Sequence, residues 1–179
     1  MSGGIRFTVV FVLIVSAAVA AAPMGARPHA AGTLTAKSDL EAAVLGEINA
    51  LRRRHGLAPL RSNARLRAAA TSHSTSMVRR GFFSHTSADG TSFSARIGRF
   101  YPPGRSGYRA IGENLLWSSP DVDATRALRM WLSSPPHRRN LLLPHWREIG
   151  LSAVHANPAP GVFRNAPTTV LTANFGVRR

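Results

Sequence analysis

Residues 131–143 read Trp-Leu-Ser-Ser-Pro-Pro-His-Arg-Arg-Asn-Leu-Leu-Leu, and this stretch marks a break between two helical patterns. Upstream of the break, apolar residues recur at the spacing of one helix face over 124–131, which predicts a long helix. Ser119-Pro120 is expected to begin that helix, with two aspartates in its first turn. The paired prolines end it, and a short helix is expected to begin at His137. The break therefore places a histidine between two helices, where function concentrates.

Two further helices are expected upstream. Ser38 and Glu41 form a capping box that predicts the start of a helix, and Gly56 is expected to follow its end. A second helix is expected to run from a cap at residues 62–63 to Gly81, with His73 on its buried face as a core or cavity-edge histidine. These spacings predict two long helices in the first half of the chain.

The rest of the chain is expected to contain shorter elements. Residues 92–97 carry a short helical pattern, and residues 101–108 are expected to form an irregular loop. Residues 149–154 and 169–175 are rich in β-branched and apolar side chains and are expected to form strands. The expected helices come first along the chain and the expected strands come late. This order predicts a single α+β or layered α/β domain.

The N-terminus resembles an export signal. Arg6 precedes an apolar run over residues 7–22, which is shorter than the ~20 residues that span a bilayer comfortably. Ala18 and Ala20 form an A-x-A pattern, so cleavage is expected after Ala20. An uncleaved membrane anchor remains the alternative.

The resulting division of the chain has three parts. Residues 1–20 are expected to be a signal peptide, residues 21–37 a flexible linker, and residues 38–179 the folded domain. The mature protein is therefore expected to be secreted, with no stable membrane span after signal cleavage.

Composition excludes several classes of protein. The chain has 179 residues and no cysteine, which excludes disulfide scaffolds, zinc ribbons, iron–sulfur clusters and thiol nucleophiles. It has 23 basic residues against 8 acidic ones, a net charge of +15, and every basic residue except Lys37 is arginine. This excess favours either an anionic lipid or cell-envelope ligand or simply a solvated basic surface. Nucleic acid is not expected as a partner, because the basic residues are not interleaved with aromatic ones.

Three polar residues at breaks between expected elements are the candidates for chemistry. They are His85, Glu113 and His137. Two imidazoles and one carboxylate suit a metal site with open positions for water, and the same groups suit general acid–base catalysis. A third alternative is that they are paired polar residues that tie loops to the core. The residues alone leave all three open.

Several segments occur in an order that resembles the CAP superfamily, which comprises cysteine-rich secretory proteins, antigen 5 and plant pathogenesis-related 1 proteins. The similarity is to its cysteine-free bacterial branch and to the SCP domain. The matching segments are residues 48–52, 68–97, 107–108, 111–117, 131–143, 149–151 and 171–176. The resemblance implies an α/β fold, a three-layer α-β-α sandwich with a central antiparallel sheet.

The resemblance also implies a cavity lined by two histidines and two glutamates that can hold a divalent cation. His85, Glu113 and His137 match three of these positions, and Ser134 stands where the second glutamate is expected. The implied metal ligands are therefore His85, His137 and Glu113. Two imidazoles and one carboxylate suit zinc better than calcium, which takes six to eight oxygen ligands.

Two functions follow from the resemblance. The first is a non-catalytic extracellular binding module that holds a cation together with a lipid or cell-wall ligand. The second is a metal-assisted hydrolase of peptide or cell-wall polymer, in which Glu113 serves as the catalytic base. The missing second glutamate and the lack of an obvious nucleophile favour the first.

Overall fold

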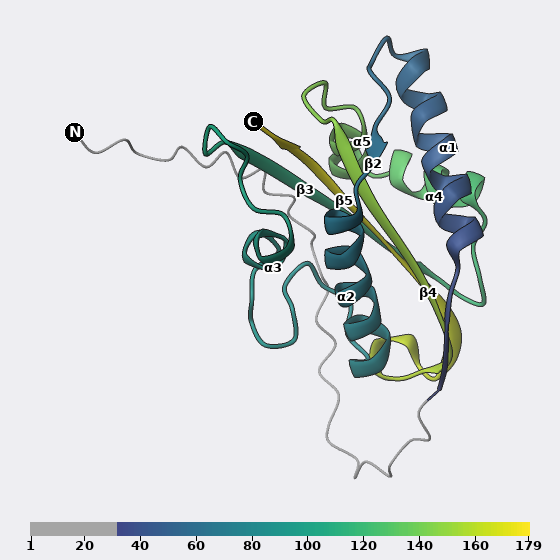
Figure 1. Ribbon diagram of the computed structural model, residues 1–179. Helices are drawn as coiled ribbons and strands as arrows, with labels where there is room; N and C mark the ends of the chain where they lie inside the picture. The colour runs from purple at the N-terminus through teal and green to yellow at the C-terminus, as the bar shows by residue number, and fades with distance from the viewer. Residues whose placement is uncertain (1–31) are drawn as a thin grey trace.

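The computed structural model describes residues 32–179 (Figure 1). The expected signal peptide and most of the expected linker lie outside the described residues. The elements, in chain order, are β1 (Thr33–Ala36), α1 (Ser38–Arg54), β2 (Arg61–Ser62), α2 (Ala64–Arg80), α3 (Phe93–Phe100), β3 (Arg109–Ser118), α4 (Ala124–Leu132), α5 (Pro135–Leu141), β4 (Glu148–Ala159), a 3₁₀ turn (Gly161–Phe163) and β5 (Ala166–Arg178). No helix within this range is long and apolar enough to cross a lipid bilayer.

The strands form one sheet in the order β1-β4-β5-β3, and β2 pairs with β4. All pairings are antiparallel except that of the two-residue β2. Helices α1, α4 and α5 cover one face, and α2 and α3 cover the other (Figure 1). The expected three-layer α-β-α sandwich is therefore confirmed.

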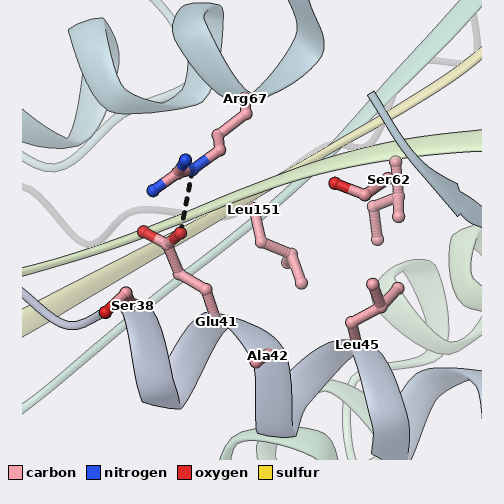
Figure 2. Close-up of a pocket in the computed structure, with 8 residues that line it drawn as sticks. Ser38, Glu41, Ala42, Leu45, Ser62, Arg67 and Leu151 are labelled. Carbon is pink, nitrogen blue, oxygen red and sulfur yellow. Dashed lines mark hydrogen bonds and ion pairs between the residues drawn. The ribbon is translucent and has the colours of Figure 1, made fainter. Parts of the chain in front are cut away.

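The outer edge of β4 is covered in two separate places. β1 pairs with its far part, and β2 pairs with its beginning at Glu148 and Ile149. Between them, the Glu41 carboxylate accepts the backbone N–H of Ala153 at 3.0 Å and a second bond from Arg67 Nε at 3.0 Å. Glu41 of α1 and Arg67 of α2 are part of the lining of a pocket of about 280 Å³. Figure 2 shows the two side chains paired with each other, with Leu151 beside them.

Glu41 does not form the expected capping box. Ser38 is the first residue of α1, Lys37 is the N-cap, and no side chain caps the helix. The prediction was wrong because the Glu41 side chain satisfies a backbone N–H of β4 instead of one in its own first turn.

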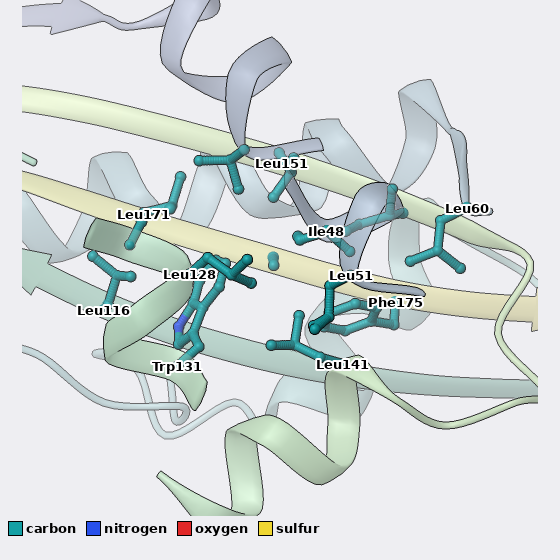
Figure 3. Packing of buried hydrophobic residues seen from close by; sticks show 14 of the residues in the cluster. Ile48, Leu51, Leu60, Leu116, Leu128, Trp131, Leu141, Leu151, Leu171 and Phe175 are labelled. Atoms are coloured by element: carbon teal, nitrogen blue, oxygen red, sulfur yellow. The ribbon is translucent and has the colours of Figure 1, made fainter. Parts of the chain in front are cut away.

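The larger core lies between the sheet and the α1–α4–α5 layer. Leu51, Leu128, Trp131 and Phe175 are among its buried residues, and they come from two helices and a strand (Figure 3). Alternate residues of β5 face this core, and those between them face α2, because side chains alternate across a strand. β5 is buried on both faces for this reason.

Helix α2 lies directly on the backbone of β4. A Cβ atom at Gly150 would sit 2.0 Å from the backbone nitrogen of Arg67 and 2.1 Å from the carbonyl carbon of Leu66. The close approach of the helix to the strand therefore depends on the absence of a side chain at Gly150.

The N-terminal cap of α2 is as expected, since the Asn63 side chain accepts hydrogen bonds from the backbone nitrogens of Arg65 and Leu66.

Helices α4 and α5 begin at different residues from those expected. α4 begins at Ala124, and the Asp123 side chain caps it by accepting from Arg126 N. Asp121, which was expected in the first turn, instead accepts bonds from Lys37 Nζ at 2.5 Å and Thr169 Oγ1 at 2.7 Å. α5 begins at Pro135 and not at His137, because proline fits the first turn of a helix.

Three strands were not expected: the two-residue β2, and β1 and β3. Residues 33–36, which were expected to be linker, form β1 and pair with β4, Thr33 opposite Asn157. β3 occupies residues 109–118, is buried along most of its length, and pairs with β5 from Arg109 to Ser118. The strands expected at 149–154 and 169–175 are present and longer.

Candidate functional site

Glu113 lies in the middle of β3, opposite Asn174 of β5. Its side chain is 1% exposed, and both carboxylate oxygens are bonded. Oε1 is 2.8 Å from His85 Nδ1, and Oε2 accepts from Arg96 Nη2 at 2.6 Å. The Asn174 amide, with its nitrogen turned toward Glu113, also donates to Oε2 at 3.1 Å.

These partners keep Glu113 ionised. Burial alone raises its pKa, but the hydrogen bond from His85 and the positive charge of Arg96 outweigh burial. The pKa of Glu113 is therefore held below its usual range. A buried carboxylate with both oxygens bonded serves as a fixed acceptor for its neighbours.

His85 lies in the loop that connects α2 to α3. Because a carboxylate only accepts hydrogen bonds, the contact with Glu113 places the proton of neutral His85 on Nδ1. Nε2 then carries a lone pair, and within residues 32–179 this buried atom has no hydrogen-bond partner. The imidazole is thereby fixed in both tautomer and orientation.

Arg96 organises this loop, and sequence reasoning did not identify it. Its Nη1 donates to the backbone oxygen of His85 at 3.0 Å and to Ser87 Oγ at 2.8 Å, while Nη2 holds Glu113. Arg96 lies beside Ile97 on the buried face of α3. A single charged residue on the apolar face of a short helix was the signal available in the sequence.

His73 holds the same loop from the side of α2. It is 1% exposed, and its Nε2 donates to the backbone oxygen of Ser84 at 2.8 Å. Burial lowers the pKa of His73 to about 4, so the ring is neutral at pH 7. His73 was expected to be a core or cavity-edge histidine, and it is buried while also lining a pocket. Its bond fixes the residue before His85.

His137 lies in the first turn of α5, in the helical layer formed by α1, α4 and α5. Asn114, the neighbour of Glu113 on β3, donates to the backbone oxygen of His137 at 3.1 Å and accepts from Asn140 at 3.0 Å. Burial lowers the pKa of His137, and a positive charge on the His85 ring would lower it further. In the described part of the chain, His137 Nε2 is also buried without a partner.

Ser134 is the N-cap of α5, one turn before His137, and it makes no side-chain cap bond. Nearby, Trp131 Nε1 donates to the backbone oxygen of Leu115 on β3 at 3.1 Å. The predicted residues therefore gather around the β3 edge of the sheet: Glu113 on one side, and His137 and Ser134 on the helix that covers the other.

The positions of these histidine and glutamate side chains determine which atoms could bind a metal ion. Within residues 32–179, no three His, Asp or Glu side chains are grouped closely enough to hold a cation together. The atoms that fit one are the two buried Nε2 atoms of His85 and His137. Glu113 stands behind His85, in the position of a carboxylate that orients a ligating imidazole. The ligand set of His85, His137 and Glu113 stays a prediction.

Relatives with known structures share this fold. An extracellular protein containing an SCP domain from Bacillus anthracis str. Ames is 27% identical, with a TM-score of 0.61 over 79% of this chain and 41% of that one. An outer surface protein from Borrelia burgdorferi is 21% identical, with a TM-score of 0.65 over 83% of this chain and 99% of that one, and shows the fold alone.

Sequence comparison identifies the family. The uncharacterized membrane protein YlbC of Bacillus subtilis (strain 168) is 31% identical over 111 residues, which are 62% of this chain and only 30% of that protein. The chain thus spans less than half of both YlbC and the Bacillus anthracis protein. The model of the Cysteine-rich secretory protein family, CAP, matches residues 45–174. The chain therefore belongs to the CAP family, as a member without cysteine.

Proposed function

We propose that this protein is an extracellular, non-catalytic binding module that holds a divalent cation, with zinc favoured, between His85 and His137. One observation carries the proposal: the buried Nε2 atoms of His85 and His137 both lack hydrogen-bond partners among the described residues, and both histidines are bonded to neighbouring residues of β3. His73, on α2, has a third such imidazole nitrogen, Nδ1. Such atoms are costly unless something binds them. The hydrogen bond that His85 Nδ1 donates to Glu113 leaves the lone pair of Nε2 free for a ligand.

The state of Glu113 favours binding over hydrolysis. A general base must accept a proton near the operating pH. Glu113 is bonded at both oxygens and has a lowered pKa, so it is a weak base. The metal-assisted hydrolase, with Glu113 as its base, is for this reason the alternative and not the main proposal.

A lipid or anionic cell-envelope ligand is also part of the proposal, and it is supported by the net charge of +15.

Calorimetric titration with zinc at pH 7 tests the cation site. One binding site is expected, and His85→Ala and His137→Ala should each weaken it by at least about 100-fold, because each removes one of two imidazole ligands. Ser134→Glu should tighten binding by adding a carboxylate. Affinity should fall as the pH drops, because protons compete for both rings, but the lowered pKa of His137 delays this loss at that ring.

His155→Ala is the matched control. His155 lies on β4, and its Nδ1 pairs with Thr169 Oγ1, away from the site. This variant should bind zinc like the wild type. Unchanged zinc binding in both His85→Ala and His137→Ala would reject the site. Zinc-dependent hydrolysis of peptide or cell-wall polymer that Glu113→Gln abolishes, with zinc still bound, would establish the hydrolase instead.

Export is the second part of the proposal. It is supported by the apolar run after Arg6, the Ala18 and Ala20 pattern, and the extracellular SCP-domain protein that this chain resembles. N-terminal sequencing of protein from the culture medium should begin within two or three residues of Ala21. Recovery of only the intact chain in the membrane fraction would reject cleavage and favour the anchor.

A further inference from the structure

A second pocket lies between α2, the loop after it, and α3, next to Arg96 (Figure 1 shows these elements). Its volume is about 320 Å³, at the lower end of the ~300–1,000 Å³ typical of small-molecule sites. Ser72, Ser76 and Arg80 line it from α2 at four-residue spacing, which places them on one helix face. Arg99 lines it from α3.

The charge of this pocket is positive. Arg96 forms its inner wall and is neutralised by Glu113 at 2.6 Å. Arg80 and Arg99 have no ion-pair partner within 4.0 Å among residues 32–179. Asp89, on the loop, is the one acidic side chain of the lining. Two guanidinium groups against one carboxylate leave this pocket with a net positive charge.

Most of the side chains that line the pocket are polar. Serine and threonine hydroxyls stand beside the guanidinium groups, and Ala88 and Phe100 are the only apolar side chains of the described lining. Guanidinium groups match phosphate and carboxylate oxygens in pairs, and hydroxyl groups donate to the same oxygens. The chemistry that fits is a small anion with several acceptor oxygens.

We infer that this pocket binds a small oxyanion of the phosphate class, held by Arg80 and Arg99 and by the hydroxyls of Ser72 and Ser76. The pocket leaves room beside the anion for a short organic group, so the occupant is either free phosphate or a small phosphate ester. The inference does not depend on the cation site, because its ligating side chains are different.

Calorimetric titrations at constant ionic strength test this inference with three probes: inorganic phosphate, glycerol 3-phosphate and neutral glycerol. Saturable binding of the two anions and none of glycerol is expected. Arg80→Gln and Arg99→Gln should each weaken anion binding by about tenfold or more, the effect of losing one charge-assisted hydrogen bond. Asp89→Asn should tighten it, because it removes the opposing charge.

Arg79→Gln is the matched control, since Arg79 is the exposed neighbour of Arg80 on the same helix and does not line the pocket. It changes the net charge equally and should bind like the wild type. Tighter binding of glycerol 3-phosphate than of phosphate would support an ester as the occupant, and equal binding would support the free anion. Equal weakening by all three arginine variants, or no saturable binding of either anion, would overturn the inference.

Discussion

Replacing Glu113 by glutamine is expected to lower the free energy of unfolding by about 3–5 kcal/mol, as when one partner of a buried ion pair is removed. The variant leaves Arg96, which is 6% exposed, without its negative partner. It also removes the charged acceptor that fixes His85. Urea denaturation of wild type and variant at pH 7 measures the difference.

Arg96→Met in the Glu113→Gln background is the control. The double variant removes the unpaired charge as well, so it should recover part of the lost stability. A loss below about 1 kcal/mol in Glu113→Gln would show that the pair behaves like an exposed one, against the burial described above.

At acid pH, the difference in the free energy of unfolding between the wild type and Glu113→Gln should become smaller. The pKa of folded Glu113 is lower than its ordinary value of 4.5, so its contribution to stability is complete above pH 4.5. The contribution is lost as the pH falls from there through the pKa of the folded state. Since the glutamine variant has no such group, the gap in stability should narrow below pH 4.5. A gap that stays constant to about pH 3 would contradict this assignment.

Gly150→Ala is expected to cost about 3 kcal/mol or more, at or above the upper end of the usual overpacking penalty. The added Cβ would meet backbone atoms of Leu66 and Arg67, which cannot move aside like a flexible side chain. Helix α2 would have to shift away from β4. Thermal and urea unfolding monitored by circular dichroism measure the loss.

Gly46→Ala provides the opposite case. Gly46 lies within α1, and a Cβ there would meet no atom within 4 Å. Alanine in the interior of a helix is more favourable than glycine by roughly 0.5–1 kcal/mol, so this variant should gain stability. Similar losses in both variants would reject the steric explanation for Gly150.

The helices were predictable from the sequence because one side of each faces the core. Periodicity located α1 and α2, and in α2 the cap at Asn63 and the left-handed residue at Gly81 are as expected. β3 was not predictable in this way, because it is buried along nearly all its length and shows no alternation of polar and apolar residues. Glu113 and Asn114 made it look like a loop.

The site was only partly predictable. His85, Glu113 and His137 stood out as polar residues at breaks between expected elements, and only the resemblance to a family assigned them to one cavity. Arg96 was not identified, because its role arises from the convergence of α3, the loop and β3, which no local pattern encodes. The expected capping box failed for a related reason: Glu41 bonds a strand far away in the sequence.

The bond from Trp131 to Leu115 has a consequence for how copies of the protein meet. Leu115 belongs to β3, an outer strand of the sheet, and unpaired carbonyls on such strands invite pairing with another chain. The indole donates to one carbonyl of this outer strand, and on the opposite side the sheet ends in two short strands, β1 and β2, with Glu41 bonded to β4 between them. Strands as short as β1 and β2 offer another chain few backbone groups to pair with, which limits aggregation by strand addition on that side of the sheet.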